Sequence, residues 1–194
     1  MTQKQTLFLD VDGVLLDFTG PFADFWNRGL QLNRWIGEPI DNNPKTWSFG
    51  YCRGIDDMSE IDRANASFND EHDHLPLIHP DISEILSDLQ NRFTIELVTA
   101  YPNQEKRVSN LLHHQLPFDK ITCDVHNKLG HIQESEKNGS IVVAIFEDGP
   151  HHLEKMMPHY GGKIWAPSRW NYLKPLMTDE RIRFYDSPYE WKQL

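Results

Sequence analysis

The sequence has few of the residues on which disulfide scaffolds, zinc sites and membrane spans depend. Its two cysteines, Cys52 and Cys123, are far apart and form no CxxC pair, so we expect two free thiols rather than a disulfide. The ten histidines show no HExxH or Cys/His spacing, which favours surface or packed histidines over a zinc site. No apolar run reaches the length of a membrane span and no signal peptide is visible, so we expect a cytoplasmic protein with no membrane partner.

Positive charge is also scarce. Lys and Arg number 19 against 29 Asp and Glu residues, which gives a formal net charge of -10 at pH 7. A protein that binds nucleic acid polymers usually presents a broad basic surface, and this balance argues against such a partner. A small anionic substrate would need local positive charge, either from a metal ion or from a few placed lysines and arginines.

The apolar content is sufficient for one packed domain of the α/β class. Hydrophobic residues make up 39% of the 194 residues, which argues against global disorder. Short apolar runs alternate with segments of helical periodicity, which predicts a Rossmann-like parallel sheet flanked by helices on both faces. The expected strands are residues 7–10, 93–99, 121–125, 141–148 and 163–166. The expected helices are residues 80–89, 103–115, 129–137 and 151–157.

Residues 18–76 interrupt this alternation. They are rich in Asn, Asp, Gly, Pro and aromatic residues, and amphipathic helices are expected at 22–30 and 55–68. We interpret this segment as a small, mostly helical cap inserted after the first strand, with residues 1–17 and 77–194 as the core domain. Because ligands of open α/β sheets bind at the carboxyl ends of the strands, such a cap would cover the active site.

Two aspartates, Asp10 and Asp12, follow the first expected strand, and Gly13 then allows a sharp turn. Folding alone does not favour two acids at the end of a core strand, because burial and mutual repulsion both oppose their charge. A divalent cation would offset both effects, and one carboxylate could then act as a nucleophile while the other transfers protons. The pattern therefore predicts a catalytic site.

A second apolar run, residues 141–146, also ends in acids followed by a glycine. If this strand lies beside the first, Asp148 would complete an oxygen-rich metal site with Asp10, and Glu147 is a further candidate. Hard carboxylates without a clear His or Cys partner favour Mg²⁺ over zinc.

Together these segments resemble the haloacid dehalogenase superfamily of aspartate-nucleophile phosphatases, and the resemblance extends over nearly the whole chain. The matching segments are residues 8–13, 96–100 and 145–149. The resemblance implies that Asp10 is the nucleophile and a metal ligand. It implies that Asp12 is the general acid and base, with its backbone carbonyl on the metal. It also implies that the Thr99 hydroxyl and the Ala100 amide bind phosphate, and that Asp148 completes an Mg²⁺ site.

This superfamily also uses a lysine that neutralises the phosphate and the nucleophile. Lys128 follows the expected strand at 121–125 and precedes Asp148, which fits the order of the motifs, and it is our first candidate for binding the phosphate. Lys106 is the rival. Lys120 is disfavoured because it precedes its expected strand.

Within the superfamily, the position of the cap and two aromatic C-terminal segments are similar to the 5'(3')-deoxyribonucleotidases, which remove phosphate from nucleoside monophosphates. Those C-terminal segments are residues 165–171 and 189–191. Ala100 departs from that group, which tends to have a serine after the threonine. Trp47, Phe49 and Tyr51 of the cap are candidates for stacking on a nucleobase, although packing within the cap's own core is the favoured interpretation.

The sequence thus predicts a Mg²⁺-dependent phosphatase that works through an aspartyl-phosphate. A 5'-nucleotidase for (deoxy)nucleoside monophosphates is the leading hypothesis. The alternatives are a phosphatase or phosphotransferase for another small phosphorylated metabolite, and a non-enzymatic regulatory protein that binds phosphate ligands on the same scaffold. Asp12 argues against a dehalogenase, and Lys45 is the one cap lysine that a phosphonatase could use for a Schiff base. The oligomeric state stays open.

Overall fold

The computed structural model describes residues 4–47, 59–72 and 74–194. Phe49, Tyr51, Cys52 and the expected start of a cap helix at residue 55 lie outside these ranges. Cys123 is a free thiol, as predicted. Within the described residues, no helix combines the length and the apolar character that a membrane span requires.

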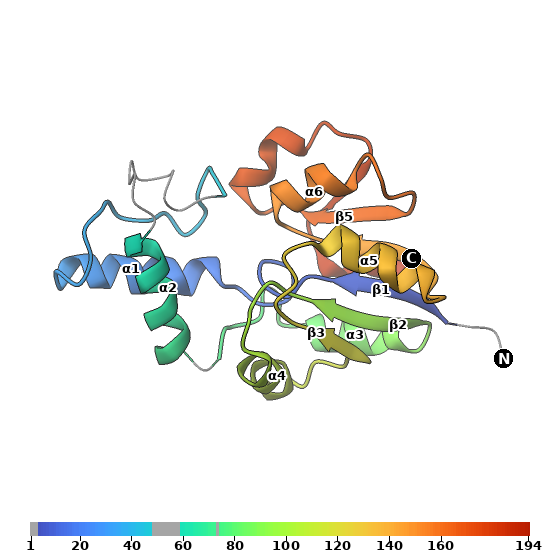
Figure 1. The fold of residues 1–194 in the computed structure, drawn as a ribbon, viewed down its shortest axis with the longest axis horizontal. Helices are drawn as coiled ribbons and strands as arrows, with labels where there is room; N and C mark the ends of the chain where they lie inside the picture. The colour runs from blue at the N-terminus through green and yellow to red at the C-terminus, as the bar shows by residue number, and fades with distance from the viewer. Residues whose placement is uncertain (1–3, 48–58, 73) are drawn as a thin grey trace.

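Six parallel strands form one sheet in the order β3-β2-β1-β4-β5-β6 (Figure 1). The strands are β1 Gln5–Leu9, β2 Phe93–Val98, β3 Lys120–Thr122, β4 Val142–Phe146, β5 Lys163–Pro167 and β6 Ile182–Tyr185. This arrangement confirms the predicted parallel α/β fold. It places β1 between β2 and β4, so the carboxyl ends of these three strands lie side by side.

The bounds of β1, β2, β4 and β5 differ from the prediction by one to two residues at an end, and β3 and β6 differ more. The strand expected at residues 121–125 is shorter and begins at Lys120, so Lys120 lies within β3 and not before it. The edge strand β6 was not predicted, because it has only four residues and Arg183 interrupts its apolar run. Ile182 and Tyr185 at its two ends are buried, Arg183 is exposed and Phe184 is half-buried, and this pattern is too short to show a strand period.

Helices cover both faces of the sheet (Figure 1). The helices of the core are α3 Ile82–Gln90, α4 Gln104–His113, α5 Lys128–Lys137 and α6 Pro150–Met156, followed by the 3-10 helices η2 Asn171–Leu176 and η3 Pro188–Gln193. Side chains of β1 alternate between the two faces: Leu7 and Leu9 pack in one apolar cluster with α3, whereas Phe8 packs in a second cluster with α5 and α6. The continuous apolar run of β1 reflects this burial on both faces.

Helices α1 Thr19–Gln31 and α2 Ser59–Glu71 pack against each other beyond the carboxyl end of β1 (Figure 1). Aromatic rings hold them together: Phe22 and Phe25 of α1 both meet Phe68 of α2 edge to face. Trp35 completes this small core by packing parallel to the ring of Trp26. We call α1, α2 and residues 32–47 between them the α1–α2 unit.

Polar contacts fasten the α1–α2 unit to the sheet domain at two places. Asn43 forms three hydrogen bonds at the start of η2. Its side-chain amide donates to the Arg169 carbonyl at 2.7 Å. Its Oδ1 and its backbone carbonyl accept from Asn171 at 2.8 and 2.9 Å. On the other side, Lys106 Nζ of α4 donates to the Asn69 carbonyl of α2 at 2.6 Å. These contacts bring the unit over the carboxyl ends of β1 and β2.

Candidate active site

The loop after β1 depends on Gly13. This residue has a φ of +81°, and a Cβ built on it would lie 1.8 Å from Oδ2 of Asp148. A side chain here would therefore be strained in its backbone and would also displace a carboxylate. Trp170 Nε1 donates to the Gly13 carbonyl at 2.9 Å, which fixes the loop beneath the C-terminal part of the chain.

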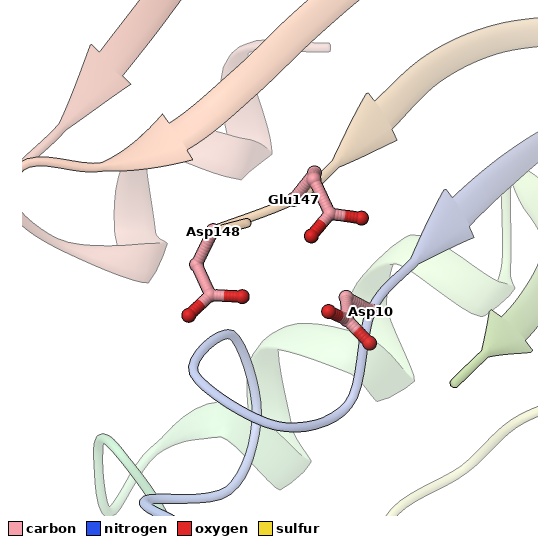
Figure 2. A group of neighbouring side chains, drawn as sticks. All are labelled: Asp10, Glu147 and Asp148. Carbon is pink, nitrogen blue, oxygen red and sulfur yellow. The ribbon is translucent and has the colours of Figure 1, made fainter. Parts of the chain in front are cut away.

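Three carboxylates meet where β1 and β4 end (Figure 2). Asp10 follows β1, and Glu147 and Asp148 follow β4; each offers one oxygen, and these oxygens lie within 4.8 Å of one another. All three residues are buried. They are brought together by the parallel pairing of β1 with β4, which puts Leu9 opposite Phe146.

Lys128, the first residue of α5, inserts between two of these acids. Its Nζ lies 2.6 Å from Asp10 Oδ2 and 2.8 Å from Glu147 Oε2. The second oxygen of Glu147 accepts the backbone N–H of Gly149 at 2.8 Å, so protein donors occupy both of its oxygens. Three carboxylates and one ammonium leave a charge of about -2 in a buried place, which a divalent cation would neutralise.

The pKa values of the site reflect this crowding. Burial raises the pKa of Asp10 to about 6. The nearby Lys128 charge opposes this rise, and repulsion from Glu147 adds to it. Burial and the charges of Asp10 and Glu147 raise the pKa of Asp148 well above its usual value. Burial opposes the charge of Lys128, but attraction to Asp10 and Glu147 prevails and raises its pKa, so the ammonium stays protonated.

The residues of this cluster suit a hard cation. Tyr172 donates its hydroxyl to Asp148 Oδ2 at 2.6 Å, whereas Asp148 Oδ1 is buried and has no hydrogen-bond partner among the described residues. A buried carboxylate oxygen without a donor is costly unless a cation meets it. Oxygen ligands alone, without His or Cys in the cluster, favour Mg²⁺ over zinc.

The side chain of Asp12 lies outside this cluster. Its Oδ2 pairs with Arg107 Nη2 of α4 at 2.7 Å, and its Oδ1 is buried with no partner in the part of the chain that the structure describes. Burial raises the pKa of Asp12, and the Arg107 charge counteracts part of that rise.

A cavity of about 480 Å³ lies above these acids, between the sheet and the α1–α2 unit. The candidate residues that line it are Asp10, Asp12, Thr99, Ala100, Lys128, Glu147 and Asp148. Thr99 Oγ1 accepts the backbone N–H of Tyr101 at 3.1 Å, which shapes the turn after β2. The rival lysines do not line this cavity: Lys106 contacts α2, and Lys120 pairs with Glu96 at 2.7 Å.

Sequence reasoning did not single out several residues at or beside the cavity. The cavity is lined by two residues of α2, Asn65 and Asn69, and by His151 and Tyr172 of the sheet domain. Arg107 does not line the cavity but forms an ion pair with Asp12, which does. Their chain positions carry no recognisable motif. Trp47 of the predicted cap lines the cavity as well, and its ring packs on His151 and Tyr172.

Mg²⁺ is expected to raise the melting temperature of the protein, and Asp148→Asn to remove most of that increase. A ligand present at about 100 times its Kd raises the free energy of unfolding by about 2.7 kcal/mol. For a chain of this length, that corresponds to a rise in melting temperature of about 5–10 °C. Thermal denaturation after chelation, with and without added Mg²⁺, measures the effect. Asp88→Asn, on the exposed side of α3, is the matched control. An equal Mg²⁺-induced increase in Asp148→Asn would show that the ion binds elsewhere.

Comparison with known proteins supports the fold and extends to the whole chain. Among solved structures, a haloacid dehalogenase-like family hydrolase from Streptococcus pneumoniae has a TM-score of 0.71 at 18% identity, over 100% of this chain and 99% of that one. A protein described as a "predicted phosphatase" from Clostridium acetobutylicum has a TM-score of 0.70 at 16% identity, over 99% and 98%. One described as a "predicted phosphoglycolate phosphatase" from Haemophilus somnus has a TM-score of 0.66 at 14% identity, over 100% and 98%.

No family model matches the sequence, and no curated protein sequence matches it. These three neighbours are described as a haloacid dehalogenase-like hydrolase and two predicted phosphatases, and at these identities they establish the Rossmann-like fold that the chain shares with them.

Proposed function

We propose that this protein is a Mg²⁺-dependent phosphomonoesterase of the haloacid dehalogenase type, with Asp10 as its nucleophile. The observation that carries the proposal is the 2.6 Å ion pair of Asp10 with Lys128, next to Asp148, in the wall of a cavity of about 480 Å³. A nucleophilic carboxylate, a fixed positive charge and a metal-binding acid are the parts that phosphoryl transfer needs in one place.

In this proposal Asp10 attacks phosphorus with one carboxylate oxygen, and the P–O bond to the leaving alcohol breaks as the new bond forms. Asp12 gives a proton to the leaving oxygen and then takes one from the water that hydrolyses the aspartyl-phosphate. Lys128 and the Ala100 amide stabilise the charge on the phosphoryl oxygens. Thr99 Oγ1 accepts from Tyr101, and its hydroxyl hydrogen would be donated to the phosphate in this proposal.

Asp10, Asp148 and the Asp12 carbonyl would hold Mg²⁺, which supplies positive charge that stabilises the phosphoryl oxygens. We assign Glu147 a different role from its contacts with Lys128 and with the Gly149 amide. It positions the lysine beside the nucleophile and keeps it protonated.

Residues 18–76 act as the cap in this proposal, and residues 1–17 and 77–194 as the core domain. The contacts of Asn43 with Asn171, and of Lys106 with Asn69, support this division because they seat the α1–α2 unit over the cavity. A covered cavity excludes water while the phosphate is transferred.

The substrate class that we favour is the (deoxy)nucleoside monophosphates. The cavity is large enough for a small ligand, and the rings of Trp47, His151 and Tyr172 form an aromatic wall on which a base can stack. The alternative is a smaller phosphorylated metabolite. One neighbour is described as a phosphoglycolate phosphatase, and Ala100 lacks the hydroxyl that is usual in the deoxyribonucleotidases.

A panel of nucleoside monophosphates, phosphoglycolate, sugar phosphates and p-nitrophenyl phosphate, assayed with Mg²⁺, tests this assignment. We expect the highest kcat/KM for a nucleotide. Trp47→Leu should lower that value by about 5- to 150-fold, since stacking contributes about 1–3 kcal/mol per base. The same variant should change kcat/KM for phosphoglycolate, which has no ring to stack on Trp47, less than about twofold. Tyr189→Leu, an exposed ring outside the cavity, is the control.

Other outcomes select the alternatives. Inactivity towards every nucleotide together with turnover of another phosphate ester would remove the nucleotidase assignment and keep the phosphatase. Transfer of phosphate to an added alcohol would define a phosphotransferase. Tight ligand binding without turnover of any ester would define a non-enzymatic regulatory protein.

A further inference from the structure

Arg107 links the two loops that carry the candidate catalytic groups. Its Nη2 lies 2.7 Å from Asp12 Oδ2, in the loop after β1. Its guanidinium also lies over the ring of Tyr101, in the loop after β2, with 4.3 Å between the guanidinium carbon and the ring centroid. The Arg107 side chain is 3% exposed and the Asp12 side chain 28% exposed, so solvent and salt reach the ion pair from the Asp12 side only.

Arg107 contacts the reaction space only through these neighbours. It is not among the described residues that line the large cavity, whereas both Asp12 and Tyr101 are. It lies instead in a separate small crevice between α2 and α4, beside Phe68 and Asn110. A phosphate ester bound in the cavity would therefore meet Asp12 and not Arg107.

Asp12 has little else to hold its carboxyl group. Its Oδ1 has no hydrogen-bond partner in the described part of the chain, and Arg107 supplies the one ion pair of its Oδ2 there. A carboxylate on a loop can rotate freely about its side-chain torsions unless such contacts restrain it. An ion pair with a buried, planar guanidinium that is itself packed on a ring restrains the carboxyl group.

We propose that Arg107 is a positioning residue that holds the Asp12 carboxyl in the orientation from which it protonates the leaving group. The inference rests on the proposed phosphatase function and extends it to a residue outside the cavity. Arg107 attaches the acid of the β1 loop to α4, and its contact with Tyr101 keeps that acid in register with the phosphate-binding turn at Thr99.

The dependence of kcat/KM on the leaving group tests whether Arg107 positions Asp12 for proton donation. An alkyl alcohol leaves as a strong base and needs a proton during bond breakage, whereas p-nitrophenolate leaves without one. The value of kcat/KM includes the steps up to formation of the aspartyl-phosphate and excludes its hydrolysis. A misplaced acid must therefore lower kcat/KM for alkyl phosphates more than for the aryl phosphate.

The experiment compares Arg107→Met and Arg107→Lys with the wild-type protein on a nucleoside monophosphate, an alkyl phosphate and p-nitrophenyl phosphate. Arg107→Met should lower kcat/KM for the alkyl ester by about 10²-fold, the lower end of what a general acid contributes, and for the aryl ester by less than about threefold. Arg107→Lys should restore at least about a tenth of the alkyl activity, because it returns one donor. Arg92→Met, an exposed arginine stacked on Phe93, is the matched control.

A second pair of variants separates positioning from folding. Arg107→Met leaves the half-buried Asp12 carboxylate unpaired, but in an Asp12→Asn background no such charge remains. In that background Arg107→Met should cause no further loss of kcat/KM. The proposal would be overturned if Arg107→Met lowered kcat/KM equally for the alkyl and aryl esters. It would also be overturned if Arg107→Met lowered kcat/KM in the Asp12→Asn background by as much as in the wild-type background.

A crystal structure of Arg107→Met gives a readout that does not depend on turnover. We expect the Asp12 carboxyl to leave the orientation that it has in the wild-type protein. If it keeps that orientation, Arg107 does not position it, whatever the kinetics. If the wild-type protein hydrolyses no phosphate ester, the proposed function fails, and this structural comparison still decides whether Arg107 sets the orientation of Asp12.

Discussion

Asp10→Asn is expected to abolish Mg²⁺-dependent phosphate release. The amide cannot attack phosphorus, and the loss of a nucleophile of this kind costs about 10⁴-fold or more in turnover. The substitution keeps the shape of the side chain and lowers the charge of the buried cluster, so the fold should persist. The measurement is release of p-nitrophenol and of inorganic phosphate, with a thermal denaturation curve to show that the variant is folded.

The control for this variant is Asp17→Asn, the same substitution seven residues further along the chain. Asp17 accepts the backbone N–H of Gly20 and does not line the cavity, so its loss should leave turnover near the wild-type value. Mass spectrometry of Asp10→Asn excludes deamidation back to aspartate. Sustained turnover by the intact asparagine variant would show that Asp10 is not the nucleophile.

Lys128→Met is expected to reduce both stability and activity. It removes the ammonium from between Asp10 and Glu147 and leaves two buried carboxylates without a counter-charge. The loss of one partner of a buried ion pair lowers the free energy of unfolding by about 3–5 kcal/mol. It also removes a charge that stabilises the transferring phosphoryl group, which should lower kcat by about 10²- to 10³-fold. Urea denaturation without Mg²⁺ measures the first effect, and steady-state kinetics measures the second.

The two effects of Lys128 can be separated. Adding Glu147→Gln to Lys128→Met removes one of the unpaired carboxylates, so stability should recover in part while activity stays low. Lys137→Met, at the exposed end of the same helix, should change neither. If Lys106→Met were the inactive variant and Lys128→Met retained full activity, the assignment of the phosphate-binding lysine would be reversed.

Much of the fold follows from patterns that are local in the sequence. The strands β1 and β4 are apolar runs buried on both faces, and the helices between them repeat apolar residues at helical spacing, so their order along the chain predicts a parallel sheet. The strand β6 could not be predicted in this way, because it has only four residues and Arg183 interrupts its apolar run. The ends of β3 differ for a related reason, since pairing with β2 over Glu96–Val98, and not composition, decides where it begins and ends.

The site was only partly accessible from the sequence. Asp10 and Asp148 each follow an apolar strand, so their approach could be anticipated once the strands were assumed to be neighbours. Glu147 was a weaker candidate, because its ion pair with Lys128 is known only when α5 is placed beside β4. Arg107 had no signal at all, since it lies 95 positions from Asp12 and nothing in the order of residues joins them.

The sequence by itself determined the elements and their chemistry: buried strands that end in acids, glycine where the chain must turn, and a set of carboxylates suited to a hard cation. These properties depend on residue type and on spacing within a few positions. Both can be read from the hydrophobic periodicity and the charges of the sequence. The tertiary structure alone decided the partners. Which lysine meets Asp10, which arginine holds Asp12 and which rings enclose the cavity depend on strand order and helix packing, because these contacts join residues that are remote along the chain.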